Sequence, residues 1–348
     1  MQEMTGKQRF LATMAGQEAD RVPISLLLEP EFVMHSYGEK VSNYYKNIDK
    51  CVGAFLNVQR AFPADAIDVT TTLPQLGEVF GHPPSYPDDG YPVLKEPVFN
   101  SMEDLAKARI RDIGSIPVFQ AKFEVLEQLV GYLGEEVAIG ARCTGTFNLA
   151  RELVGNERLL TAIVMEPDFV HKIASLACEV MIRLGKEYIN CGVDFIYYPD
   201  GASSPSWISP DQYEEFAMPY HERFFESIKT MGVKTVYHPC GGEYPILCQV
   251  RTIKGIDAYH FSELVDPGVS RKIYGPRKVL WASVNPYRTL LRGSPADVKA
   301  EVKSVVEKAA QAGNTIIAPG CTLPALTPKE NITAMVNAVR EFGKMEAV

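Results

Sequence analysis

Apolar segments of strand length recur eight times along the chain, and most are apolar throughout rather than alternating with polar residues. Continuous runs of this kind are typical of strands in a parallel sheet that is covered on both faces. The segments lie at residues 22–28, 66–72, 137–143, 193–200, 233–240, 257–264, 279–285 and 314–321.

Helical patterns fill the intervals between these segments. Residues 166–190 place Phe169 and Ile173 on one helix face, and residues 7–15 form a first helix with Thr5 as its N-cap. Three later helices share one start motif: an N-cap hydroxyl, a proline at the first helical position and an acidic or amide residue at the third. The hydroxyls belong to Ser209, Ser294 and Thr327, and helix ends are marked by Gly192, Gly232, Gly313 and Gly343.

Eight apolar strands that alternate with helices predict a (β/α)₈ TIM barrel, and no linker divides residues 1–348 into two domains. Two additions are expected, an N-terminal helix within residues 5–16 and a long loop at residues 73–100. This loop is rich in Pro and Gly and follows the second strand, on the catalytic face of such a barrel. We interpret it either as a lid or as an insertion that packs on the barrel.

Composition narrows the class of protein. The chain has 348 residues, of which 46% are hydrophobic and 22% charged, as in a soluble globular protein. No apolar run is long enough for a membrane span, and the N-terminus lacks the pattern of a signal peptide, so we expect a cytoplasmic protein. A net charge of −8 argues against nucleic acid as a partner. Seven scattered cysteines favour reduced thiols over disulfides.

Two of the predicted strands end in soft metal ligands. The segment VKTVYHPC closes with His238 and Cys240, and NTIIAPGC closes with Cys321. Chemistry in TIM barrels sits at the C-terminal strand ends, and alternate strand residues point the same way. One His and two thiolates with a vacant fourth position suit a catalytic zinc. We therefore predict a zinc site at His238, Cys240 and Cys321.

Other strand-end residues are candidates for roles around the metal. We expect Asp200 and Glu263 to be catalytic, either beside the metal or in orienting His238. The alternative is that such carboxylates cap helices or form ion pairs. The fourth metal ligand stays open among Cys143, Asp200, Glu263 and Glu29.

Aromatic residues and the remaining Cys and His residues carry less information. Tyr197 and Tyr237 are expected to line a cofactor-binding pocket, although aromatic side chains in barrel strands are usually core. His260 is interpreted as a hydrogen-bonded barrel histidine. Cys51, Cys178, Cys191 and Cys248 are interpreted as structural residues. Asp65 and Asp68 are expected to form ion pairs or to cap helices. No functional site is assigned to His35, His82, His171 and His221.

The ligand types indicate a reaction. Thiolate ligands donate charge, so zinc held by them activates water poorly and is better suited to bind a thiol substrate. A thiol is deprotonated when it coordinates a metal, and the resulting thiolate is a strong nucleophile. The hypothesis is attack by that sulfur on an activated methyl group.

Several segments of the chain resemble a known family. The sequence resembles the uroporphyrinogen decarboxylase-like superfamily and, within it, the zinc-containing methylcobamide:coenzyme M methyltransferases. The similar segments are GKQRFLATMAGQEADRVPI, GARCTGTFNLARELVG, the run from Asp200 through GASSPSWISPDQYEEFAMPYHERFFESIK, HPCGG, and APGCTLPALTPKENITAMVNAVREFG. The resemblance implies a barrel, zinc on His238, Cys240 and Cys321, methylcobalamin carried by a corrinoid partner protein, and a small thiol acceptor such as coenzyme M.

The decarboxylase branch fits less well. Its arginine-rich segment after the first strand is replaced here by LLLEPEF, and threonines 70–72 stand where its catalytic aspartate is expected. A porphyrinogen substrate with many carboxylates needs cationic side chains. Decarboxylation stays an alternative, as do a cobalamin-independent homocysteine methyltransferase and a barrel that binds without turnover. Thiol acceptor, methyl donor, direction of transfer and oligomeric state stay open.

Overall fold

The computed structural model describes residues 3–241, 252–310 and 314–344. Eight strands form one parallel sheet in the order β1 to β8, each paired with the next along the chain. A parallel bridge between Ile24 and Ile317 joins the first and last edges, so the sheet closes on itself. The predicted (β/α)₈ barrel is confirmed. The strands are β1 (Ser25–Leu26), β2 (Ala66–Thr70), β3 (Ala138–Arg142), β4 (Phe195–Pro199), β5 (Lys234–His238), β6 (Ala258–His260), β7 (Val279–Val284) and β8 (Thr315–Pro319).

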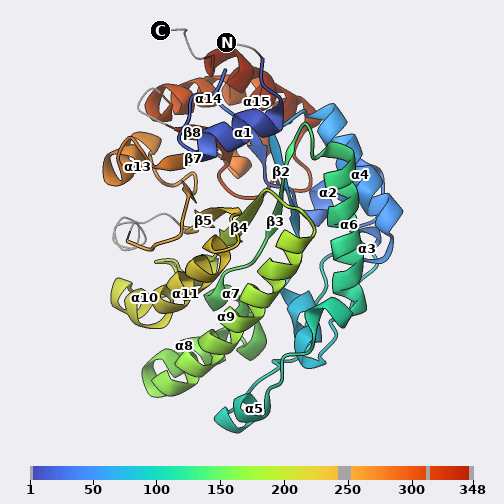
Figure 1. The fold of residues 1–348 in the computed structure, drawn as a ribbon, viewed down its shortest axis with the longest axis vertical. Coiled ribbons are helices and arrows are strands. Elements are labelled where there is room, and N and C mark those ends of the chain that lie inside the picture. Colours follow the sequence, from blue (N-terminus) through green and yellow to red (C-terminus); the bar gives the residue numbers. More distant parts are fainter. Residues whose placement is uncertain (1–2, 242–251, 311–313, 345–348) are drawn as a thin grey trace.

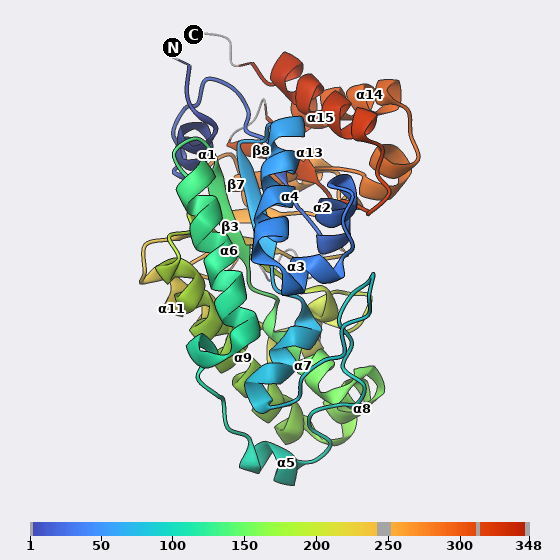
Figure 2. The ribbon, with the colours of Figure 1, turned by 90° about the vertical axis from the view of Figure 1, so that its right-hand side faces the viewer.

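Helices surround this barrel, with both termini at one end of the molecule and α5 and α8 at the other (Figure 1). Figure 2 shows α4 and α6 side by side on the outside of the barrel. The α-helices are α1 (Gly6–Met14), α2 (Pro30–Ser36), α3 (Ser42–Lys46), α4 (Ile48–Ala61), α5 (Met102–Lys107), α6 (Pro117–Leu133), α7 (Thr146–Val154), α8 (Asn156–Met165), α9 (Pro167–Asn190), α10 (Pro210–Phe216), α11 (Met218–Lys229), α13 (Pro267–Tyr274), α14 (Pro295–Ala309) and α15 (Lys329–Phe342). Shorter turns are η1 (Leu73–Phe80), η2 (Ile113–Ser115), η3 (Gly201–Ser203) and the π-helical turn η4 (Pro286–Leu291). Within the described ranges, no helix has the length and apolar character to cross a membrane.

The barrel has two apolar layers, because neighbouring strand residues face opposite sides. Phe195, Tyr197 and Val236 belong to the interior cluster, whereas Tyr198 and Tyr237 belong to the cluster between strands and helices. This alternation decides which strand-end residues reach the centre of the barrel.

Helix α1 closes the N-terminal end of the barrel. Its Thr5 cap and Gln8 form a reciprocal capping box, as expected for the predicted helix. Phe10 enters the barrel interior, where its ring centre lies 4.9 Å from that of Phe195 and 5.9 Å from that of Trp281. These contacts make the N-terminal end a packed plug.

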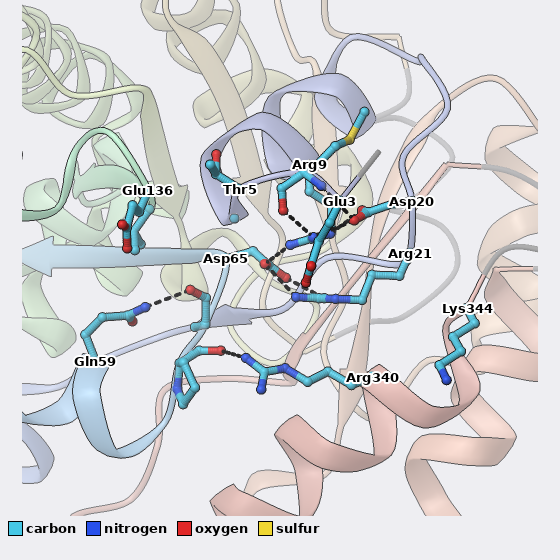
Figure 3. Close-up of a pocket in the computed structure, with 15 residues that line it drawn as sticks. Glu3, Thr5, Arg9, Asp20, Arg21, Gln59, Asp65, Glu136, Arg340 and Lys344 are labelled. Carbon is cyan, nitrogen blue, oxygen red and sulfur yellow. Dashed lines mark hydrogen bonds and ion pairs between the residues drawn. The ribbon is translucent and has the colours of Figure 1, made fainter. Parts of the chain in front are cut away.

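An ion-pair network lies outside this plug, beside a cavity of about 690 Å³ (Figure 3). Arg9 and Arg21 both bind Asp65, with nitrogen–oxygen distances of 2.6 and 2.8 Å, and Arg9 also pairs with Asp20. Arg340 extends from α15 and donates to the carbonyl oxygen of Pro63. The ion-pair role expected of Asp65 is confirmed, and the network ties α1 to the strands at the end opposite the predicted metal ligands.

The long loop after β2 contains more structure than its composition predicts. Its first part is η1, which begins with a capping box between Thr72 and Gln75 and buries Val79. A bridge between Ser85 and Val93 then folds the remainder back on itself. The first part is therefore a packed insertion.

Several predicted boundaries extend past the observed strands. Strands β5, β6 and β8 end at His238, His260 and Pro319, so Cys240, Glu263 and Cys321 lie in the loops that follow. Two of the three predicted helix caps are confirmed, since Ser209 and Ser294 both accept from the third helical N–H. The third cap is wrong: Thr327 donates to the carbonyl oxygen of Pro324 instead, and α15 begins at Lys329. Gly313 and Cys248 lie outside the described residues.

One buried cation lies in the outer layer of the barrel. Lys122 of α6 is 4% exposed, and its Nζ lies 3.7 Å from the centre of the Tyr44 ring. Within the described residues this ammonium group has no hydrogen-bond partner. Burial lowers the pKa of Lys122 to about 8, and the neighbouring thiol of Cys51 opposes that shift only in part. The charged form of Lys122 therefore costs stability at neutral pH.

We expect Lys122→Met to stabilise the protein at pH 7 by roughly 1–3 kcal/mol, because it replaces a buried charge with an apolar side chain of similar length. Between pH 8 and about 10.4 the unfolded chain keeps a proton that the folded chain has lost, so the wild type gains stability as pH rises. The advantage of the variant should shrink across that window. Denaturant unfolding of both proteins from pH 7 to pH 10 measures the difference in their free energies of unfolding. A difference that is independent of pH would contradict the lowered pKa of Lys122.

Candidate functional site

Three side chains come together at the C-terminal end of the barrel. One ligand atom each from His238, Cys240 and Cys321 lies within 4.8 Å of the other two. The Sγ of Cys240 is 3.0 Å from Nε2 of His238. His238 is the last residue of β5, and the two cysteines lie two residues beyond the ends of β5 and β8. The structure thus brings together the three predicted metal ligands.

The imidazole of His238 is held in one orientation. Its Nδ1 lies 2.9 Å from the backbone carbonyl oxygen of His260, which can only accept, so Nδ1 carries the proton. The ring also stacks on those of His260 and Tyr197, with ring centres 4.6 and 5.9 Å away. Nε2 is therefore unprotonated, and its lone pair points to the cysteines, where it lies 3.0 Å from Sγ of Cys240. Orientation of this kind was expected of Asp200 or Glu263, but the His260 carbonyl performs it.

A second histidine forms the floor beneath His238. Burial lowers the pKa of His260 well below its usual value, so the ring is neutral. The hydroxyl of Ser283 donates to the carbonyl oxygen of Phe261, and His260 Nε2–H therefore donates to Ser283, at 3.2 Å. Nδ1 accepts from the Tyr197 hydroxyl at 2.8 Å. The prediction that His260 is a hydrogen-bonded barrel residue is confirmed.

A close backbone approach positions Cys321. Gly320 packs so tightly on the next loop that a Cβ at this position would lie 2.6 Å from Oε2 of Glu263 and 2.7 Å from its backbone nitrogen. The N–H of Gly320 also donates to the carbonyl oxygen of Val284 at 2.8 Å. A glycine is therefore required here for the chain to turn past β7 and carry Cys321 to the other ligands.

The two thiols lie close enough to shift each other's pKa in opposite directions. A hydrogen bond from Cys321 lowers the pKa of Cys240, and the same bond raises the pKa of Cys321. Two thiolates at this separation need a cation between them. The ligands of a tetrahedral zinc lie about 3.5–4 Å from one another. One imidazole and two thiols, all within 4.8 Å, fit that requirement.

Asp200 is not part of the group of three ligand atoms, although its charge raises the pKa of Cys240. Its carboxylate accepts from the backbone N–H groups of Phe147 and Asn148, at 2.9 and 3.0 Å, in the first turn of α7. It also pairs with Nε2 of His221 at 2.9 Å, and both side chains are fully buried. Asp200 thus follows the helix-cap alternative. His221 was wrongly left without a site, because its partner is 21 residues away in the sequence.

Arg142 joins two carboxylates at the rim of the site. It contacts Asp68 at 2.7 Å through Nε and Glu29 through a terminal nitrogen, and Tyr91 donates to Glu29 at 2.6 Å. The ion-pair role expected of Asp68 is confirmed. Arg142 was not predicted as a site residue, although an arginine within the apolar segment VAIGARC is a usable signal.

Two other predicted residues point away from the metal ligands. Cys143 is fully buried against α9, where a Cβ on Gly185 would lie 3.6 Å from its Sγ. Tyr237 packs among the helices and contacts His221. Both alternate with interior residues, Arg142 and His238, and so face outward. Neither placement supports the expected site role, whereas Tyr197 does lie in the floor of the site.

The group of three ligand atoms does not extend to a fourth protein ligand within the described residues. Asp200 and Glu29 are engaged elsewhere, and Cys143 faces outward. Of the four candidates for the fourth ligand, Glu263 is the one left without another role. It lies beside Gly320, and its charge raises the pKa of Cys240.

We expect Asp200→Ala to lower the free energy of unfolding by about 3 kcal/mol, because it leaves two helix N–H groups and a buried histidine without an acceptor. The matched control is Asp266→Ala at the N-cap of α13, where the side chain is 44% exposed, with an expected loss of about 1 kcal/mol. Denaturant unfolding gives both values. Loss of bound metal with unchanged stability in Asp200→Ala would instead make Asp200 a ligand.

The family is established by sequence. The chain matches the uroporphyrinogen decarboxylase (URO-D) family from residue 5 to residue 342, and it belongs to that family. This match confirms the resemblance inferred from the motifs.

Relatives in the family carry two kinds of name. The methylcobamide:CoM methyltransferase MtaA of Methanosarcina barkeri is 25% identical over 98% of this chain and 99% of its own length. A uroporphyrinogen decarboxylase of Crocosphaera subtropica is 23% identical, with 97% of each chain covered. A solved structure of a methyltransferase from Methanosarcina mazei has a TM-score of 0.88 at 24% identity, covering 98% of this chain and 99% of that one.

Proposed function

We propose that the chain is a zinc-dependent methyltransferase that moves a methyl group between a methylcobamide, carried by a corrinoid protein, and a small thiol. The observation that carries this proposal is the group of His238, Cys240 and Cys321 at the C-terminal end of a URO-D barrel. The name of the full-length relative in Methanosarcina barkeri, methylcobamide:CoM methyltransferase, supports the same reaction class.

Zinc bound at these residues would lower the pKa of a substrate thiol and present its sulfur as a thiolate. The chain's own contribution is a rigid donor set. The His260 carbonyl fixes the tautomer of His238, and Gly320 fixes the path of Cys321. The neutral floor of Tyr197 and His260 places no charge beneath the sulfur.

In the proposed reaction the thiol would give up its proton to solvent and its sulfur would take the methyl group of the methylcobamide substrate. The electron pair of the broken cobalt–carbon bond would remain with the corrinoid, so no further reactant would be needed. Glu263 lies on the loop after β6 and packs against Gly320, the residue before Cys321. Asp200 is a positioning residue that holds α7 and His221 behind the site.

Decarboxylation of a porphyrinogen is less compatible with the charges present. That substrate carries many carboxylates and requires free cationic side chains. Here Arg142 is already paired with Asp68 and Glu29. Further carboxylates at this rim would meet Glu263 as well.

We expect about one zinc per wild-type chain and its loss in Cys321→Ala and in His238→Ala, because two protein ligands hold zinc weakly. Cys143→Ala is the matched control: it also removes a strand-end cysteine, but one that faces α9, so zinc content should be unchanged. Elemental analysis of the folded proteins measures the zinc content per chain. Zinc-free wild type with full activity, or equal zinc in all four proteins, would refute the site.

A corrinoid protein must approach the same end of the barrel. Exposed apolar side chains come from the loops after three neighbouring strands, with Leu264 72%, Tyr287 52% and Leu326 80% exposed. Single exposed apolar side chains are common on protein surfaces, so what distinguishes these three is their position in loops at the end of the barrel that carries the predicted metal ligands. We propose that they contact the corrinoid protein around its methylcobamide.

Leu326→Asp should raise the KM for the methylated corrinoid protein by about fivefold or more, since it places a charge in an apolar contact and burying an unpaired charge costs more than about 1 kcal/mol. The rate with free methylcobalamin should be unchanged, because the thiol site is intact. The control is Tyr132→Asp. Tyr132 lies near the C-terminal end of α6 and is 67% exposed in the wild type. Equal losses with free and protein-bound methylcobamide would place Leu326 in the thiol site instead.

A further inference from the structure

Cys240 lies beyond the end of the strand that carries His238. Strand β5 ends at His238, and Cys240 follows two residues later in the loop. The hydrogen bonds of the sheet therefore do not fix its Sγ, although a metal site needs its ligands held to within about 0.5 Å. Another part of the chain must hold this loop in place.

The turn that follows β4 packs against Cys240. A Cβ on Gly201 would lie 3.5 Å from Cβ of Cys240 and 3.8 Å from its Sγ, so the space between them is only large enough for a methyl group. The N–H of Asp200 donates to the carbonyl oxygen of His238 at 3.2 Å. The turn at residues 199–204 thus lies against both Cys240 and the strand end before it.

Asn148 ties this turn to the first turn of α7. Its Nδ2 donates to the carbonyl oxygen of Pro199 at 3.1 Å, and its Oδ1 accepts from the N–H of Ala202 at 2.9 Å. These two backbone groups lie on either side of Gly201 in the sequence. The carboxylate of Asp200 makes the reverse connection by accepting from the backbone N–H of Asn148 at 3.0 Å. Both groups of the Asn148 amide therefore hold the turn on which Cys240 rests.

We propose that Asn148 is a positioning residue for metal binding. It holds the turn at residues 199–204, and the turn holds the Sγ of Cys240 where a shared metal ion requires it. The hydrogen bonds described for the Asn148 side chain reach this turn and Thr144, not the three predicted ligands, so it acts through the turn. This inference rests on the proposed function and adds a residue to its metal site.

The zinc affinity of Asn148→Ala tests the inference without any thiol or corrinoid. Removal of a group that orients a metal ligand from outside typically weakens metal binding by about 10–100-fold. We expect zinc to bind Asn148→Ala roughly tenfold or more weakly than the wild type, in competition with a chromophoric chelator. The cobalt(II)-substituted protein gives a second readout: its thiolate-to-cobalt absorption should weaken or shift, because Cys240 is displaced from the metal.

Asn331→Ala is the matched control for a general loss of stability. The Nδ2 of Asn331 donates to the carbonyl oxygens of Leu290 and Gly293, at 2.9 and 2.7 Å, in the segment after β7, which carries none of the predicted ligands. Asn331 is 1% exposed and Asn148 is half-buried, so the control should lose at least as much stability in denaturant. We expect it to keep the zinc affinity and the cobalt spectrum of the wild type.

Substitutions at Gly201 test the contact with Cys240 even if Asn148→Ala does not fold. A single Cβ fits at this position, so Gly201→Ala should keep the zinc affinity of the wild type. The γ-methyl groups of a valine extend about 1.5 Å further. Gly201→Val should therefore displace Cys240 and weaken zinc binding roughly tenfold.

The outcomes separate this inference from the proposed function. Wild-type zinc affinity in Asn148→Ala or in Gly201→Val, or an equal loss in Asn331→Ala, would overturn the positioning role while the methyltransferase proposal stands. Methyl transfer from methylcobalamin to small thiols is assayed separately with the zinc-loaded wild type. Tight zinc binding without transfer to any thiol would count against the proposed function and leave the positioning of Cys240 supported.

Discussion

The alternation of side chains along the strands of a closed parallel barrel determines the whole site. Successive residues face opposite sides, and closure leaves one interior in which all inward side chains must meet. His238 faces that interior and Tyr237 does not, although they are neighbours in sequence. The same rule places Arg142 at the rim and sends Cys143 into the helix layer. Residue type alone would have treated Cys143 and Cys240 as equals.

The two ends of the barrel carry different kinds of polar network. At the N-terminal end, Arg9 and Arg21 fully pair with Asp65, and α1 seals the interior. At the C-terminal end, the polar groups are oriented toward one another: His238 directs its unprotonated Nε2 to Cys240, and that thiol and Cys321 lie within reach of the same metal ion. Stability is thus concentrated at one end, and capacity to bind a ligand at the other.

Much of this arrangement can be predicted from the sequence, because it depends on short-range pattern. Eight apolar runs give the barrel, and ligand residues at two strand ends give His238, Cys240 and Cys321. Contacts that depend on the exact path of a loop are not predictable in this way. The pairing of Asp200 with His221 requires knowing how α11 returns to β4, and Arg142 becomes a rim residue only when Asp68 and Glu29 flank it. The Thr327 cap failed for the same reason, since a competing carbonyl lies three residues upstream.

We propose that His238, Cys240 and Cys321 hold zinc and leave one position on the metal for the substrate's sulfur. The most direct measurement is X-ray absorption at the zinc edge, before and after addition of a thiol. We expect about two sulfur neighbours and one or more light-atom neighbours in the free protein, and about three sulfurs when thiol is bound. A spectrum unchanged by saturating thiol would mean a closed structural site, and the methyltransferase proposal would fall with it.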